Sequence, residues 1–128
     1  IIYSVKATAK FNSEAAVYLR DCIKRGKLRL LVNEVVANDI LNKSKAYQNL
    51  LVEEQVLFRE PFDQTTAMVN EMINLDYTQV DGKIKVMEAS GMRKDRYSAI
   101  SYANHIANEL ERDMRNIEDE YGFSTFIN

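Results

Sequence analysis

The sequence predicts an α/β domain, in which short strands pack beside amphipathic helices. Three patterns lead to this prediction: alternating apolar residues at the N-terminus, helical spacing directly after them, and a hairpin signal followed by a long helical stripe. The 128 residues suit one domain and are enough to bury roughly two thirds of the unfolded surface. We therefore expect residues 1–128 to form a single domain.

Residues 1–9 alternate between apolar and polar side chains, which is typical of a half-buried strand. A helix is expected next, capped by Asn12 or Ser13 and closed by Gly26 in the left-handed conformation. Residues 27–32 alternate and then turn apolar, which predicts a second strand, parallel to the first across that helix. Such a strand, helix and strand would begin an α/β sheet.

A long helical stretch follows, with apolar residues at mainly helical spacing from Val35 to Phe58. Pro61 interrupts this stretch. Because proline breaks a helix interior but suits a first turn, we expect a new helix to begin near Pro61 and to run through Ile73.

Asp81-Gly82 predicts a β-hairpin between residues 77–80 and 83–87, because a type I′ turn needs positive φ at both central residues. From Arg96 onward, apolar residues recur at a period of about 3.6 residues for about seven turns. This pattern predicts one long C-terminal helix.

Composition excludes several classes of protein. The net charge of −2 excludes a histone-like polycation, and no apolar run approaches the ~18 residues that a membrane span needs. No signal peptide is visible, so we expect a reducing cytoplasm, and Cys22, the single cysteine, is interpreted as a small apolar residue on a helix face. Because the chain opens inside a predicted strand without a Met, we expect it to be a fragment of a longer protein.

Charge is unevenly distributed along the chain. Basic residues cluster in 24–29 and again in 83–96, whereas acidic residues dominate 109–120. One end of the molecule could therefore meet a polyanion. Solvated helix ends and hairpins also carry Lys and Arg without any ligand, so charge alone leaves both interpretations open.

Other common sites are absent from the sequence. No P-loop motif is present to bind nucleotide phosphates. His105, the only histidine, has no cysteine or second histidine to complete a zinc site and is predicted to lie at the surface or edge of the long helix. Tyr97 and Tyr102 could stack on bases, although tyrosines on an amphipathic helix usually lie at the edge of a core.

Asp95 is the best-placed acid, because it lies at the predicted start of the long helix between cationic neighbours. Its oxygens could cap the helix or could bind a hard divalent cation, and the two roles do not exclude each other. Metal-dependent cleavage of a phosphodiester requires several acidic ligands. Glu88 is the only other acid nearby in the sequence that could bind an ion together with Asp95. Arg93, Lys94 and Arg96 could meet phosphate oxygens.

The segment 91–102, GMRKDRYSAISY, resembles the C-terminal nuclease segment of tailed-phage terminase large subunits, which are DNA-packaging motor proteins. Residues 4–16 and 25–34 look like the segment that precedes it in the same family. The resemblance extends from residue 4 to about residue 111, with the segments in the same order.

This resemblance implies an RNase H-like nuclease fold, a mixed sheet with flanking helices, in which acids from three places hold Mg²⁺ or Mn²⁺. The last of these acids lies at the start of a C-terminal helix in the family and corresponds to Asp95, which the resemblance makes a catalytic, metal-binding residue. The other two lie earlier in the family's nuclease domain, before the point where this chain begins. We therefore expect a domain that lacks its leading strands, a two-metal site completed by residues outside this chain, and an inactive isolated fragment.

The resemblance also implies a function. The parent protein would cut concatemeric viral DNA in the host cytoplasm and transiently at the procapsid portal. Its partners would be double-stranded DNA, the portal protein and the small terminase subunit, within an oligomeric motor and without a membrane. The expected contacts to the DNA backbone are Arg93, Lys94, Arg96, Lys83 and Lys85.

An alternative function belongs to a different class. The chain could be a non-catalytic docking module whose long helix binds a partner protein, such as portal, through Tyr97, Leu110 and Met114.

Overall fold

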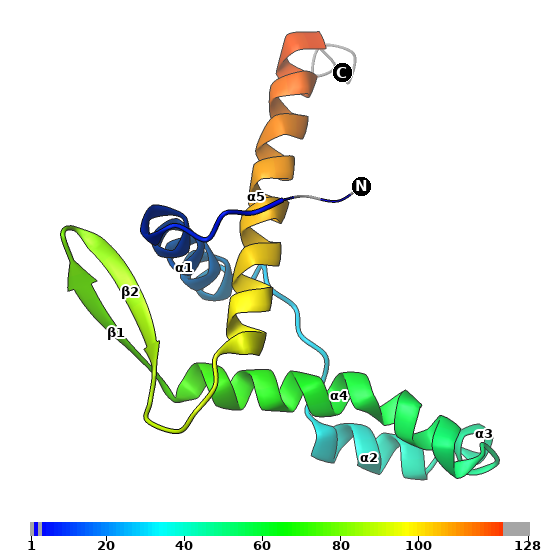
Figure 1. Cartoon of the computed structure of the whole chain (residues 1–128). Helices are drawn as coiled ribbons and strands as arrows, with labels where there is room; N and C mark the ends of the chain where they lie inside the picture. Colours follow the sequence, from blue (N-terminus) through cyan, green and yellow to red (C-terminus); the bar gives the residue numbers. More distant parts are fainter. Residues whose placement is uncertain (1, 3, 122–128) are drawn as a thin grey trace.

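The computed structural model describes residues 2 and 4–121, and it is mixed α/β, mostly helical with one small sheet (Figure 1). The two strands of this sheet are antiparallel. In chain order the elements are α1 (Ala9–Lys24), α2 (Glu34–Asn42), α3 (Lys45–Gln48), α4 (Val52–Ile73), β1 (Leu75–Val80), β2 (Lys83–Glu88) and α5 (Asp95–Tyr121).

The elements are arranged around the first turns of α5. α1 and the hairpin lie on one side of the first half of α5, and α4 passes its start, where the two helices are in contact (Figure 1). α2 and α3 pack beside α4 and form with it an arm that extends away from the other elements. The start of α5 is therefore the junction between the hairpin and the arm.

The two strands predicted in the N-terminal part are wrong. Residues 4–8 and 27–33 have no regular secondary structure, while Ile1 and Tyr3 lie outside the described residues. A strand needs a neighbour to pair its N–H and C=O groups. Among the described residues the sheet contains β1 and β2 alone, so the predicted parallel pair is not formed.

The helix predicted after residue 9 is present as α1, but its cap differs. Thr8 caps it, and its Oγ1 accepts a hydrogen bond from the Phe11 N–H at 3.1 Å, so Asn12 and Ser13 lie inside the helix. Ser13 Oγ instead accepts a hydrogen bond from the Ile84 N–H of β2 at 2.9 Å. This bond joins α1 to the outer edge of the hairpin.

The predicted end of α1 at Gly26 is confirmed. Gly26 has a φ of 66°, its N–H donates to the Ile23 carbonyl, and the Lys27 N–H donates to the Cys22 carbonyl, both at 3.0 Å. This pair of bonds is a Schellman motif, which needs a left-handed residue after the helix.

The new helix expected at Pro61 is wrong, because α4 continues through this residue for 22 residues in all. Proline removes one backbone hydrogen bond and crowds the preceding turn, at a cost of about 3 kcal/mol in a helix interior. α4 keeps its other bonds on both sides and packs along α2. Tertiary packing therefore outweighs a local preference in this helix.

The predicted hairpin and long helix are confirmed. Asp81 and Gly82 have φ values of 49° and 74°, as a type I′ turn requires, and Val80 pairs with Lys83 across it. α5 extends from Asp95 for 27 residues.

His105 is buried, so the expected surface position is wrong. It is only 4% exposed, with its ring centroid 4.5 Å from that of Phe11 and 5.3 Å from that of Tyr18, on which it stacks. His105 follows the buried Ser101 by one helical turn and so lies on the face of α5 that packs against α1. Its aromatic neighbours supply the contacts that an apolar side chain would otherwise make.

Among the side chains that the structure describes, Leu19 is the largest that is fully buried, and it lies on α1, which contacts β2 and α5. Leu19→Ala should therefore lower the free energy of unfolding by about 2–5 kcal/mol, from lost burial and the cavity left behind. Urea unfolding followed by circular dichroism measures this change. Leu57→Ala is the matched control, because Leu57 is 66% exposed on α4, and it should cost less than about 0.5 kcal/mol. Equal losses in the two variants would contradict this account of the core.

Candidate functional site

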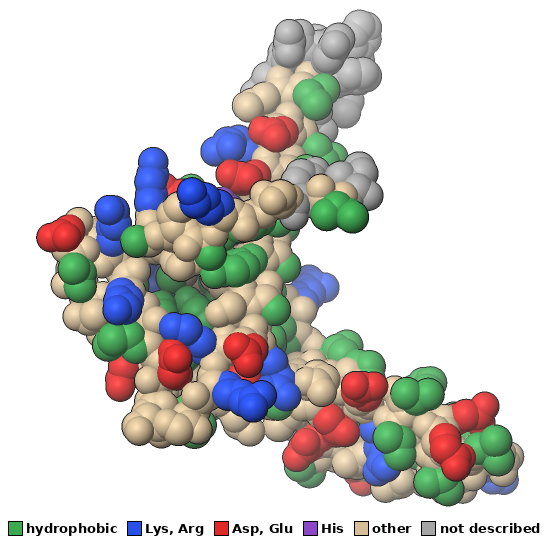
Figure 2. Space-filling view, viewed as in Figure 1, with side chains coloured by type: hydrophobic (Ala, Val, Ile, Leu, Met, Phe, Trp, Pro, Cys, Tyr) green, Lys and Arg blue, Asp and Glu red, His purple; other side chains and the backbone are tan. Residues whose placement is uncertain are grey.

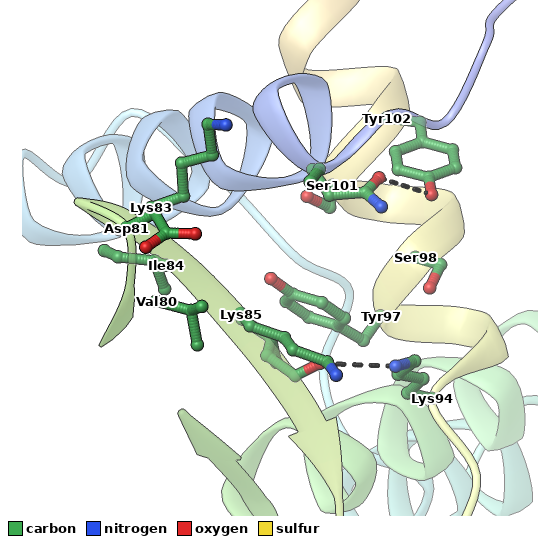
Figure 3. A pocket seen from close by; sticks show the side chains of 13 residues that line it. Val80, Asp81, Lys83, Ile84, Lys85, Lys94, Tyr97, Ser98, Ser101 and Tyr102 are labelled. Carbon is green, nitrogen blue, oxygen red and sulfur yellow. Dashed lines mark hydrogen bonds between the residues drawn. The ribbon is translucent and has the colours of Figure 1, made fainter. Parts of the chain in front are cut away.

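A cavity of about 480 Å³ opens between the hairpin, the start of α1 and the first turns of α5 (Figure 3). Three lysines line it: Lys83 and Lys85 from β2, and Lys94 from the residue directly before α5. β2 contributes its lysines at alternate positions, so that both lie on one face of the hairpin. The structure thus brings together three of the five residues that the sequence predicts to contact DNA.

The surface around this cavity carries both acidic and basic side chains, and many of them are Lys or Arg (Figure 2). Figure 2 shows Lys and Arg side chains gathered over α1, the hairpin and the start of α5, with some acidic ones among them, whereas the arm carries mainly acidic and apolar side chains and fewer cations. Arg93 is exposed in the loop between β2 and α5 and does not line the cavity. Arg96 faces α4 instead, through contacts described below.

Lys94 fastens the start of α5 to the hairpin. Its ammonium donates to the Val86 carbonyl at 3.2 Å (Figure 3). It also pairs with Glu88 Oε2 at 2.8 Å. The bond from Lys94 lowers the pKa of the Glu88 carboxyl, and the charge of Lys85 acts in the same direction. Glu88 therefore neutralises part of the positive charge at this end of the cavity.

Two tyrosines of α5 line the cavity beside the lysines. Burial raises the pKa of Tyr97, and a hydrogen bond with Ser101 only partly offsets that effect, so the phenol stays protonated and able to donate. Tyr102 donates to Asn12 Oδ1 at 2.8 Å and packs edge-to-face on Phe11. Tyr102 is thus fixed to α1, in the core-edge role that the sequence also allowed.

Asp95 is exposed at the first position of α5. It shares one face of the helix with Ser98 and Tyr102, three and seven residues later, and both of these line the cavity. Asp95 itself does not line the cavity, but it directly follows Lys94, which does. Within residues 2 and 4–121, its carboxylate takes part in no hydrogen bond or ion pair, and the N–H groups that a cap would bind are taken by another residue.

That residue is Glu71, near the end of α4, which the sequence analysis missed. Its Oε2 accepts hydrogen bonds from the N–H groups of Arg96 at 2.9 Å and of Tyr97 at 3.1 Å. Its Oε1 pairs with the Arg96 guanidinium at 2.7 Å, and Arg96 Nε also donates to Gln64 Oε1 at 2.8 Å. Glu71 thus caps α5 from a different helix, and the capping role considered for Asp95 is wrong.

The electrostatics of Glu71 follow from these bonds. Burial by itself raises the pKa of the carboxyl, because only 7% of Glu71 is exposed. The bonds from Arg96 and from the two backbone N–H groups together outweigh burial, so that the pKa lies below its ordinary value. One sequence signal could have identified this residue: Glu71 follows Met68 by three positions and thus places an acid in the apolar stripe of α4.

The described residues do not form a metal centre by themselves. In the part of the chain that the structure describes, no three Asp, Glu, His or Cys residues come together to hold an ion. Asp95 offers one carboxylate, of the hard-oxygen type that Mg²⁺ and Mn²⁺ prefer. Any such centre at Asp95 would need further ligands.

Comparison of the chain with protein-family models, curated proteins and solved structures gives no match. Of the helices in the described part of the chain, none combines the length and the apolar character needed to cross a membrane.

The lowered pKa of Glu71 predicts a dependence of stability on pH. A carboxyl whose folded pKa is below its unfolded value near 4.5 stabilises the fold above that value, and this contribution is lost as the pH falls through the folded pKa. Glu71→Gln should therefore be less stable than the wild type at pH 7, with the difference shrinking progressively below about pH 4.5. Urea unfolding between pH 7 and pH 3 tests this. Glu53→Gln, at an exposed position on the same helix, is the control, and a gap for Glu71→Gln that stays constant down to pH 3 would contradict the prediction.

Proposed function

We propose that this chain is the C-terminal part of the nuclease domain of a tailed-phage terminase large subunit, which cuts concatemeric double-stranded DNA during packaging. The observation that carries the proposal is the position of Asp95. Asp95 is exposed and directly follows Lys94, which lines the lysine-lined cavity, and the structural task that competes for its carboxylate, capping α5, belongs to Glu71. The resemblance of residues 91–102 to terminase nucleases gives this geometry its chemical interpretation.

In this proposal Asp95 supplies one carboxylate to a two-metal site for Mg²⁺ or Mn²⁺, and other parts of the parent protein supply the remaining acids. Bound ions of this kind activate water and stabilise the leaving oxygen of a phosphodiester. The parent domain would have an RNase H-like fold, in which the hairpin and α5 belong to a larger mixed sheet and its flanking helices.

Lys83, Lys85 and Lys94 would bind phosphate oxygens of the DNA backbone beside Asp95. Lysine ammonium groups act as point charges and read no base sequence, so their contribution should be independent of sequence and sensitive to salt. Arg93, and the part of Arg96 that remains open, would extend this surface; the Arg96 side chain is 41% exposed despite its bonds to α4.

Asp95→Asn in the parent protein should reduce DNA cleavage by more than about 100-fold, since loss of a residue that only supports a metal ligand commonly costs roughly 10–100-fold. ATP hydrolysis should remain largely intact. Asp113→Asn is the matched control, because Asp113 is an exposed aspartate farther along α5, and it should cut normally. Normal cleavage by Asp95→Asn would contradict the assignment of Asp95 to the metal site.

Lys83→Gln and Lys85→Gln should each weaken DNA binding uniformly across sequences. Each change should reduce the slope of log affinity against log salt by about 1, because one fewer counterion is released. Fluorescence anisotropy with a labelled duplex at several salt concentrations measures this slope. Lys43→Gln, directly after α2 and away from the cavity, should leave this slope unchanged. Unchanged slopes in both hairpin variants would contradict backbone contact there.

The second candidate function, a non-catalytic docking module for a partner protein such as portal, is favoured by one surface. Leu110, Met114 and Ile117 are exposed to 43%, 63% and 52%, and their spacing places them on one face of α5. Tyr97 lines the cavity and does not belong to this surface. Mn²⁺ added to the chain discriminates the two functions, since a pure docking module should show no localised change around Asp95.

A further inference from the structure

α4 and α5 meet at the first turn of α5, and Glu71 is the acid at that contact. The first N–H groups of any helix have no partner within the helix, and the residue before the helix usually satisfies them. In α5 that residue is Lys94, whose ammonium cannot accept a hydrogen bond. The geometry of the first turn therefore depends on an acceptor from another element, and Glu71 is that acceptor.

The hydrogen bonds to Glu71 hold the first turn of α5 against α4. A carboxylate that is 93% buried is costly unless it is fully paired, and Glu71 accepts from two N–H groups and one guanidinium at 2.7–3.1 Å. Its negative charge also lies at the positive end of the α5 dipole. These terms favour one orientation of the first turn relative to α4.

Asp95 lies between two anchored neighbours. On one side Lys94 is fastened to Val86 and Glu88 of β2, and on the other side the Arg96 N–H is fastened to Glu71. The backbone of Asp95 is thus fixed at both ends, although its own side chain is exposed.

We propose that Glu71 is a positioning residue, which fixes the place of Asp95 directly after Lys94 by holding the first turn of α5. The importance of the Asp95 carboxylate rests on the proposed function. Glu71 itself binds neither metal nor DNA and acts through the two N–H groups that it accepts.

The test compares three variants of the chain. Glu71→Met keeps the length of the side chain but removes both acceptor oxygens. Glu71→Gln keeps one acceptor oxygen and loses the charge. Arg96→Met removes the guanidinium and leaves both N–H bonds to Glu71 in place, so it separates the ion pair from the cap.

Two readouts are local to the site. Amide hydrogen exchange of Arg96 and Tyr97 should accelerate by roughly tenfold or more in Glu71→Met, which corresponds to a lost hydrogen bond to a charged group. The Mn²⁺ concentration that broadens NMR signals around Asp95 should rise by about tenfold or more, as for other outer-shell supports of a metal ligand. Glu71→Gln should show both effects in weaker form than Glu71→Met. Arg96→Met should change the required Mn²⁺ concentration by less than about twofold, which is smaller than the change expected on losing an outer-shell support of a metal ligand.

A merely structural role gives a different pattern. In that case Glu71→Met would lower the unfolding temperature while exchange at Arg96 and Tyr97 accelerated no more than in the distal half of α5, and the proposal would be overturned. If Glu71→Met does not fold, Glu71→Gln and Arg96→Met are compared instead. Of these two variants only Glu71→Gln weakens the cap, so it should show the larger changes in amide exchange and in Mn²⁺ concentration. Larger local effects in Arg96→Met than in Glu71→Gln would overturn it.

Asp95→Asn distinguishes this proposal from the proposed function. If Mn²⁺ still broadens the same signals in Asp95→Asn, the metal role of Asp95 fails, while the exchange rates at Arg96 and Tyr97 in the Glu71 variants still decide whether Glu71 fixes the first turn. If Asp95→Asn abolishes the broadening and Glu71→Met retains wild-type Mn²⁺ sensitivity, the function stands and the positioning role is wrong.

Discussion

The buried carboxylate of Glu71 is the interaction on which the arrangement of this protein depends. It lies where α4 meets the first turn of α5, and it satisfies backbone groups of α5 that the Lys94 side chain cannot satisfy. An unpaired charge at this position would destabilise the fold strongly. Because Arg96 and two N–H groups surround it, the same charge stabilises the junction and sets the direction of α5 relative to α4.

The candidate site is assembled at this junction. The hairpin supplies Lys83 and Lys85, and the loop before α5 supplies Lys94, which also fastens that loop to β2. α5 then begins with Asp95, directly after Lys94, and the Asp95 side chain is exposed while Glu71 caps the helix. In the proposed function, this exposed acid would bind a metal ion while the neighbouring cations contact phosphate oxygens.

The parts of the fold that could be predicted are those whose cause lies within a few residues. Gly26 ends α1 and Asp81-Gly82 turns the hairpin because both need positive φ, and the apolar period of α5 is continuous along its length. The strands predicted at 1–9 and 27–32 are wrong. Alternation describes only a side-chain pattern, whereas a strand also requires a neighbouring strand to pair with its backbone. The helix start predicted at Pro61 is also wrong. Here packing along α2 maintains a helix that the proline alone would end.

The sequence by itself determined that Asp95 begins a helix among cations and that Lys83 and Lys85 follow a two-residue turn on one strand of a hairpin. The structure brings Lys94 to the cavity that these two lysines line. Only the tertiary structure decided which acid caps that helix. Glu71 and the N–H groups of α5 are separated by a hairpin and a loop, and no local rule relates residues at that distance. Local preferences act on the backbone of neighbouring residues, whereas a buried charge finds its partners through the packing of whole elements.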